Sequence, residues 1–295
     1  MRKKTIVIFL VSMLVVPSII VSGEQIKEKK TTSSNTMQGP IWKIGNSWTY
    51  TIYDFWVNYT YQSNNIQLAG RIDDFKLTVA DESETTYTVD ISGKVTASYK
   101  VKAILGDIVL RFNGAIDQST NKLKGSIIFD KENLHIIDFD AMLICLSSVQ
   151  FFNLPIKIPL IMKISADAAL STPFPLLDFP LSTLKFWNLP DIDIDTDVNI
   201  GGLLGILNVP MTIHRHYDWT PLAFCCLYQD TITVEGGTYD AWRILSLIGG
   251  YYDYYYAPYV GNLIKMEFNL PNGGASGELK GYEFSIPNNQ EKSVQ

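Results

Sequence analysis

Short runs of alternating residues, separated by turn signals, recur along most of the chain and constrain its fold more than any other feature. Apolar residues stand at every second position in residues 75–79, 87–91 and 95–101, with polar or glycine-containing clusters between the runs. A period of two is typical of β-strands, and turn signals roughly every 8 to 15 residues favour an antiparallel meander over alternating strands and helices. We therefore expect a mainly β protein with little helix, built as a strongly curved antiparallel sheet.

Three clusters of small or polar residues are predicted to be turns between separate strands. They are residues 81–84, the pair Ser92 and Gly93, and residues 117–121, which separate residues 108–116 from residues 123–129. Residues of these types are favoured in turns because they tolerate the backbone angles that turns require.

The first strand, within residues 48–61, is apolar on both faces if it alternates strictly. Tyr53, Phe55, Val57, Tyr59 and Tyr61 would share one face, and Trp48, Tyr50, Ile52 and Trp56 the other. Such a strand is either covered on both faces or faces a ligand with one of them.

The last quarter of the chain repeats the strand pattern clearly. Residues 230–234 should pair with residues 238–245 through Gly236 and Gly237, because glycine adopts positive φ at low cost. A tyrosine-rich strand at 251–259, a turn at 258–261, a strand at 263–269 and a closing strand at 278–286 are expected to follow.

The middle of the chain is rich in proline, with eight prolines from Pro155 to Pro221. Because proline cannot donate to a ladder, we expect edge strands, extended crossings or short helices in this region. Residues 174–180 are too apolar for a solvated loop, and we expect them to lie across the core or to close it like a lid.

The N-terminus has the pattern of an export signal. Three basic residues at positions 2–4 precede an apolar run at 6–21, and small residues follow up to Gly23. Cleavage after Gly23 is predicted; the alternative is an uncleaved N-terminal anchor, although the run is shorter than the about 20 residues of a full span. Residues 24–39 are predicted to be a disordered linker, 40–286 the β-rich domain and 287–295 a tail. No second apolar run predicts a multi-pass membrane domain.

Charge and cysteine usage exclude some classes of partner. Loss of residues 1–23 would remove three positive charges and take the formal net charge from −6 to −9. An acidic chain without a Lys/Arg cluster is a poor partner for nucleic acid or anionic head groups. Cys145, Cys225 and Cys226 are too few for a disulfide framework; one bridge from Cys145 to either of the others and three buried free thiols are both compatible with the sequence.

Two short motifs are candidate metal sites. In the first, strand alternation would place four carboxylates on one face: Asp191, Asp193, Asp195 and Asp197. Ca²⁺ prefers such oxygen ligands, but Thr196 and Gly202 occupy the positions of the EF-hand glycine and glutamate, so a solvated strand face is the alternative. In the second, His214 and His216 share a strand face but lack the further ligands of a Zn²⁺ motif. We expect no cofactor other than Ca²⁺.

The aromatic strands provide the candidate ligand-binding residues. Tyr252, Tyr254 and Tyr256 share one strand face, and tyrosine offers broad amphipathic contact area. We add Tyr53, Phe55 and Trp242 to this candidate set. The interpretation is a wall for a lipid, a glycan or a peptide; the alternative is a β-core with hydroxyls at its rim.

No catalytic motif is present. The chain lacks the Gly-x-Ser-x-Gly and His-Glu-x-x-His patterns, and the glycine-rich residues 201–205 lack the Lys and Ser/Thr of a phosphate loop. We therefore expect a protein that is not an enzyme, with a secreted hydrolase as a second alternative.

Four segments resemble exported bacterial and archaeal proteins of the TapB-like family. Residues 234–244 resemble a Val-x-Ala-Gly-Thr-Phe-Asp-Ala-x-x-Ile signature, 256–267 a Tyr-Ala-Pro-Gly-Val-Gly-Leu-Val-Lys-x-Glu segment, 279–282 a closing Leu-x-x-Tyr and 44–50 an opening Gly-x-x-Trp-x-Tyr. Gly236 stands in place of Ala, Tyr259 in place of Gly, Asn262 is inserted, and the proline-rich middle is unmatched. The resemblance implies an envelope β-protein with a curved half-barrel like lipoprotein carriers, and it supplies no catalytic residues.

The sequence thus predicts a secreted or cell-envelope, non-catalytic β-protein that binds a lipid or other apolar ligand. A glycan or another envelope protein is a further expected partner, and the first alternative function is an extracellular structural or adhesive protein stabilised by Ca²⁺. Residues 40–48 resemble residues 180–187, which suggests similar halves at 40–145 and 180–286; chance similarity of two strand starts is the alternative.

Overall fold

The computed structural model describes residues 38–61, 64–105, 108–151, 157–175, 177–188, 190–202, 207–217, 223–246, 251–270 and 273–285. These residues form 14 antiparallel strands in one sheet, with no helix among them, which confirms the mainly β prediction. The strands are β1 (Ser47–Tyr61), β2 (Asn64–Glu82), β3 (Thr86–Leu105), β4 (Ile108–Asp130), β5 (Ile136–Phe151), β6 (Lys157–Phe174), β7 (Lys185–Asn188), β8 (Ile192–Gly202), β9 (Leu207–Tyr217), β10 (Ala223–Val234), β11 (Gly237–Ser246), β12 (Tyr251–Ala257), β13 (Asn262–Leu270) and β14 (Gly273–Glu283).

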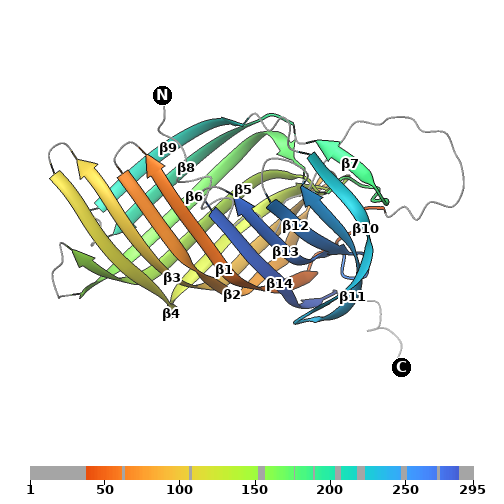
Figure 1. Ribbon diagram of the computed structural model, residues 1–295, viewed down its shortest axis with the longest axis horizontal. Helices are drawn as coiled ribbons and strands as arrows, with labels where there is room; N and C mark the ends of the chain where they lie inside the picture. The colour runs from red at the N-terminus through yellow and green to blue at the C-terminus, as the bar shows by residue number, and fades with distance from the viewer. Residues whose placement is uncertain are drawn as a thin grey trace, which may run out of the picture.

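The sheet curves into a partial ring, in which the strands drawn in orange and yellow face those drawn in green and teal (Figure 1). The order across the sheet is β7-β10-β11-β12-β13-β14-β1-β2-β3-β4-β5-β6-β8-β9, so β7 and β9 are its edges. The first strand lies beside the last: Ser47 is opposite Glu283, and Val57 is opposite Gly273. Strands from the two ends of the chain therefore meet in the middle of one continuous sheet.

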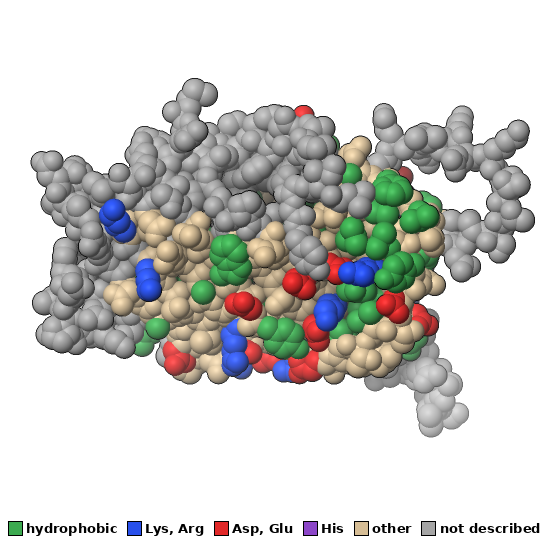
Figure 2. All heavy atoms as spheres, in the orientation of Figure 1, with side chains coloured by type: hydrophobic (Ala, Val, Ile, Leu, Met, Phe, Trp, Pro, Cys, Tyr) green, Lys and Arg blue, Asp and Glu red, His purple; other side chains and the backbone are tan. Residues whose placement is uncertain are grey.

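Alternation along β2 and its neighbours separates a mainly apolar concave face from a mainly polar convex face. On β2, Phe75, Leu77 and Val79 are buried, whereas Lys76 and Thr78 between them are partly exposed. On the face shown in Figure 2, charged side chains gather along the lower rim and hydrophobic ones toward the end formed by the C-terminal strands. A single curved layer thus buries its apolar side chains on the inside of the curve.

Two of the predicted hairpins are wrong. Ser92 and Gly93 lie inside β3, and residues 117–121 lie inside β4. The ladder shifts register at both places and again on β2 between Asp73 and Lys76. The register shifts of neighbouring strands lie beside one another, so the strands pair again beyond them. Ser92-Gly93 and residues 117–121 are therefore bulges within long strands and not turns between short ones. The predicted turn at 81–84 is confirmed, since β2 ends at Glu82 and β3 begins at Thr86.

Strict alternation on the first strand is also wrong. The pairing of β1 with β2 shifts register between Tyr50 and Ile52 and again between Ile52 and Phe55. Extra residues of this kind move the side chains that follow to the opposite face. Phe55 therefore joins Tyr50 and Ile52 in the buried set, while Tyr53 is 47% exposed on the convex face. β1 is apolar on one face, not on two.

Three buried aromatic residues, at and just before the start of β1, donate hydrogen bonds to the region where β12 turns into β13. Trp42 Nε1 donates to the Gly261 carbonyl at 3.0 Å, Trp48 Nε1 to the Val260 carbonyl at 2.8 Å, and the Tyr50 hydroxyl to the Leu263 carbonyl at 2.9 Å. Gly261 has a φ of 67°, as expected for the predicted turn at 258–261. The turn carbonyls thus satisfy indole and phenol groups that burial would otherwise leave without partners.

The proline-rich middle contains both edge strands, as predicted. Among the described strands, β7 pairs only with β10, and β9, which contains Pro210, pairs only with β8. β6 contains Pro159, but β8 pairs with only Met162–Leu170 of β6, so Pro159 has one ladder neighbour instead of two. The prolines therefore occupy positions at which no second strand needs their missing N–H group.

Several predictions fall outside the described residues. These are the export signal, the tail and all of the linker except Gln38 and Gly39. The suggested repeat stays a prediction: residues 40–48 lead into β1 in mid-sheet, whereas residues 180–187 lead into β7 at an edge. In the described part of the chain, no helix combines the length and hydrophobicity that crossing a membrane requires.

Candidate functional site

The candidate ligand-binding aromatics, except Tyr53, lie on the concave face. Trp242 on β11 is opposite Tyr256 on β12, and Tyr254 is opposite Met266 on β13. One apolar row also crosses four strands, because Phe268 is opposite both Tyr252 and Ala275, and Ala275 is opposite Phe55. Register therefore unites residues from both ends of the chain in one surface, which we call the aromatic wall (Trp242, Tyr252, Tyr254, Tyr256, Phe268 and Phe55).

Tyr53 lies apart from the aromatic wall. Its hydroxyl is 3.5 Å from Glu278 Oε2 on the convex face. Tyr53 follows the inward Ile52 in ordinary alternation and points outward, and the shift after it turns Phe55 inward, so the two residues occupy opposite faces. The sequence signal at this shift is Asp54, a residue type that is depleted in strands.

The rings of the aromatic wall are closely packed. Phe224 of β10 lies 5.6 Å from the ring of Tyr252 and 5.9 Å from that of Tyr254, with edge-on geometry. Burial raises the pKa of Tyr252 to about 12 and raises that of Tyr254 well above the ordinary tyrosine value. These phenols are therefore neutral and serve as apolar surface with a polar tip.

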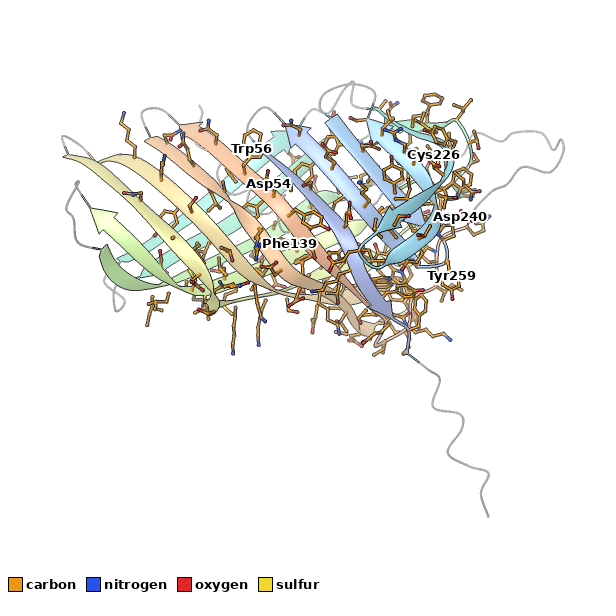
Figure 3. All side chains as sticks on the ribbon, turned by 60° about the horizontal axis from the view of Figure 1, so that its bottom comes forward. Asp54, Trp56, Phe139, Cys226, Asp240 and Tyr259 are labelled. Carbon is orange, nitrogen blue, oxygen red and sulfur yellow. The ribbon has the colours of Figure 1, made fainter. Side chains whose placement is uncertain are left out.

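Residues 177–184, which we call the strap, cover the wall. Leu177 and Leu181 are fully buried, and the Phe179 ring lies 5.4 Å from that of Tyr256. Of residues 174–180, which were expected to lie across the core or to close it, Pro175 and residues 177–179 are buried, whereas Phe174 ends β6. In Figure 3, Cys226 marks the strand that the strap joins: Leu184 N donates to the Cys226 carbonyl at 2.7 Å.

Lys185 fastens the strap to β7. Its Nζ lies 2.6 Å from the Asp178 carbonyl, 3.0 Å from the Pro180 carbonyl and 2.8 Å from Asp178 Oδ2. One ammonium group thus binds two carbonyls and a carboxylate that is only 11% exposed. Sequence reasoning missed this contact, because nothing in the sequence distinguishes Lys185 from a solvated lysine.

Two buried donors of the aromatic wall lack a hydrogen-bond partner within the described residues. They are Nε1 of Trp242 and the hydroxyl of Tyr256, which stand on directly opposed residues of β11 and β12. An unsatisfied buried polar group costs about 1–3 kcal/mol, and such groups are uncommon in folded proteins. Each of these donors could bind an acceptor oxygen of a ligand.

The concave face beyond the aromatic wall is less completely covered. Leu68 on β2, Leu143 on β5 and Leu170 on β6 pack against the core but are only half-buried. Their inward neighbours Ala97 and Ala141 are small and buried. This stretch therefore presents accessible aliphatic surface inside the curve. Sequence reasoning missed these leucines, since alternation identifies a face but not its degree of cover.

The two candidate metal motifs lie side by side on β8 and β9. In the register of the ladder, Asp193 is opposite His216 and Asp195 is opposite His214. Asp191 precedes β8 and is exposed; Asp197 lies in β8 with its side chain outside the described set. Among the side chains that the structure describes, no three His, Cys, Asp or Glu residues approach closely enough to hold a metal ion. The Ca²⁺ site stays a prediction.

The three cysteines and His135 are buried among structural contacts. All three cysteines are free and buried, and burial raises the pKa of Cys145 to about 11 and that of Cys226 to about 12, which keeps these thiols protonated. His135 Nδ1 lies 2.8 Å from Asp130 Oδ2, and Asp130 Oδ1 also accepts the Asn133 amide, so this pair braces the turn between β4 and β5.

Comparison of the chain with protein families, with curated proteins and with solved structures finds no match in any of the three.

Proposed function

We propose that the protein is a non-catalytic binding protein of the cell envelope or the extracellular space, and that it holds a lipid or similar apolar ligand against the concave face of its sheet. The observation that carries this proposal is the accessible aliphatic surface inside the curve, formed by Leu68, Leu143 and Leu170. Binding sites for small molecules are typically concave and mostly apolar, with a few polar groups that orient the ligand.

The width of the ring supports this proposal. In closed sheets, about eight strands are just enough for inward side chains to fill the interior, and larger numbers enclose additional space. This sheet has 14 strands. Near the leucines, the inward side chains include the small Ala97, Ala141 and Ala168, which occupy little of the interior.

The strap and the two unpartnered donors favour an amphiphile over a pure hydrocarbon. Movement of the strap would uncover Trp242 and Tyr256, whose indole N–H and hydroxyl can donate to a carbonyl or ester oxygen. The aliphatic part of the ligand would then lie along the leucine-lined stretch. The predicted export signal and the TapB-like resemblance support a location outside the cytoplasm.

The test is mass spectrometry of organic extracts from the purified full-length protein. We expect a co-purifying lipid, and we expect the double variant Leu68→Gln/Leu143→Gln to lose most of it, because both substitutions place amides on the concave face. Ile144→Gln is the matched control: Ile144 follows Leu143 in sequence but is 42% exposed on the convex face.

Absence of lipid from the wild-type extract, together with no uptake of a fluorescent fatty acid from vesicles, would contradict the proposal. Equal loss in the double variant and in Ile144→Gln would also contradict it, since the concave face would then have no special role. Intact-mass measurement of exported protein tests the location separately, with loss of residues 1–23 as the expected result.

A further inference from the structure

The convex face has a groove of about 990 Å³ along the line of bulges on β2, β3 and β4. Four lysines line it: Lys76, Lys94, Lys122 and Lys124. They come from three strands, and only Lys122 and Lys124 are close together along the chain, so the sequence contains no basic cluster. The bulges that replace the predicted hairpins bring these lysines together.

Strand register defines the shape of the groove. Lys76 of β2 is opposite Ser92 of β3, and Ser92 is opposite Lys124 of β4. Strands two apart are separated by roughly 10 Å, so the two lysines stand on either side of the small Ser92 and of Gly93. Ser92 and Gly93 therefore form the floor of the groove, and a lysine side chain stands on each side of it.

The acidic residues of the groove are already engaged by cations outside its lining. Asp74 Oδ1 lies 2.8 Å from Lys280 Nζ, and Asp73 Oδ2 lies 3.1 Å from Arg71 Nε, although not in hydrogen-bond geometry. Asp74 also has Lys94 at 3.9 Å.

The lysines themselves are weakly engaged. Lys76 reaches only the highly exposed Glu283, at 3.7 Å. Within the described residues, Lys122 and Lys124 make no ion pair. The groove is therefore locally cationic in a chain whose formal net charge is −6.

We infer that this groove binds a phosphate-bearing ligand with more than one anionic group. Lysine acts as a compact point charge with three donors and suits tetrahedral oxyanions, whereas arginine suits planar, bidentate carboxylates. The Ser92 hydroxyl and the Gln118 amide, also in the lining, add neutral donors. The volume exceeds that of one phosphate group, which favours an oligophosphate or a phospholipid head group as the source.

The first test is calorimetric titration of the full-length protein with tripolyphosphate at low salt. We expect saturable binding that weakens as salt rises, because bound anions compete with screening ions. Lys76→Gln/Lys124→Gln should weaken binding at least about tenfold, since it removes two charge-assisted contacts. Lys100→Gln is the matched control: it lies exposed on β3, outside the lining, and should leave binding unchanged.

Flotation with vesicles distinguishes the two sources. Binding to vesicles that contain cardiolipin, whose head group carries two phosphates, but not to phosphatidylcholine vesicles, lost in the double lysine variant, would identify a lipid head group; binding of tripolyphosphate alone would identify a soluble phosphate. No binding in either assay, or equal weakening by Lys100→Gln, would overturn the inference. The convex groove is independent of the concave lipid site, so Leu68→Gln/Leu143→Gln should leave tripolyphosphate binding intact.

Discussion

Among single residues, Arg243 and Asp253 form a contact that links β11 to β12 on the convex face. Arg243 Nε lies 2.9 Å from Asp253 Oδ1, and Nη2 lies 2.7 Å from Oδ2, so the contact is bidentate. Hydrogen bonds to Asp253 and Tyr228 raise the pKa of Arg243. The Asp253 side chain is only 9% exposed, which limits screening by water.

Asp253→Asn is expected to lower the free energy of unfolding by about 2–3 kcal/mol, because a partly buried guanidinium loses its anion. Glu82→Gln is the control: Glu82 pairs with Lys131 at 2.7 Å, but its side chain is 42% exposed, so its loss should cost less than about 1 kcal/mol. Urea unfolding followed by tryptophan fluorescence measures both changes. Equal losses of unfolding free energy in the two variants would show that burial does not strengthen the Arg243–Asp253 contact.

The buried thiols make stability dependent on alkaline pH. The folded-state pKa rises from 9.0 to about 11 for Cys145 and to about 12 for Cys226. Above pH 9 the thiols of the unfolded chain lose their protons, whereas those of the folded chain keep theirs up to the raised pKa values. The free energy of unfolding is therefore highest below pH 9 and falls as the pH rises above it. Urea unfolding across this range should show the fall, and Cys145→Ala should make it shallower. An unchanged slope would contradict the assignment.

At the scale of elements, the sequence predicted what depends on local chemistry. Glu235 and Gly236 form a turn between β10 and β11, one residue before the expected Gly236-Gly237 pair, and Tyr252, Tyr254 and Tyr256 share a face as alternation requires. Ser92 and Gly93 were misassigned, because the same residue types favour turns and bulges. The neighbouring strands decide between the two, and one strand's sequence does not contain that information.

The glycines of β14 provide a test of how tightly its neighbours pack. A Cβ atom at Gly277 would lie 2.6 Å from Ile52 Cδ1 and 3.0 Å from the Thr51 carbonyl oxygen, whereas one at Gly281 would meet nothing within 4 Å. Gly277→Ala should therefore destabilise the protein by about 1–3 kcal/mol, and Gly281→Ala should stay within about 0.5 kcal/mol of wild type. Melting temperatures measured by circular dichroism compare them; similar values would show that β1 and β14 pack loosely.

The strap offers a second test at this scale. Lys185→Met removes the ammonium that holds Asp178 and Pro180 and leaves a nearly buried carboxylate without its cation. Hydrogen exchange followed by mass spectrometry should then show faster exchange at the Leu184 amide. Lys100→Met, at an exposed lysine on β3, should not change it. Unchanged exchange in Lys185→Met would show that packing of Phe179 alone holds the strap.

For the whole molecule, the candidate sites depend on long-range register. Tyr252 and Phe55 belong to one wall only because β14 lies between β13 and β1. Lys76 and Lys124 line one groove only because β3 separates their strands. The aromatic residues could be proposed from sequence, since their residue type singles them out. The groove could not, because its four lysines are scattered through a chain of negative net charge.

The adjacency of β1 and β14 predicts tolerance of circular permutation. A chain that joins Ser285 to Gln38 through a flexible Gly/Ser linker, and opens within the exposed turn at 83–85, keeps every strand pair. We expect it to give the far-ultraviolet circular dichroism and cooperative urea unfolding of the wild type. The control opens at Gly125 inside β4 and should not fold. Failure of the first permutant to fold would show that the order of synthesis matters for folding.

Because β14 pairs with β1 but is synthesised last of the described strands, the unfinished chain has an open sheet edge that cellular quality control can recognise. A ribosome makes β1 first and β14 last of the described strands, so the bonding edge of β1 stays open until nearly the whole chain has emerged. Exposed edges of long strands are templates for pairing with other chains, which makes the nascent protein a substrate for holding chaperones. A chain interrupted before β14 would keep two open edges in mid-sheet, at β1 and at β13, and would be recognisable as incomplete.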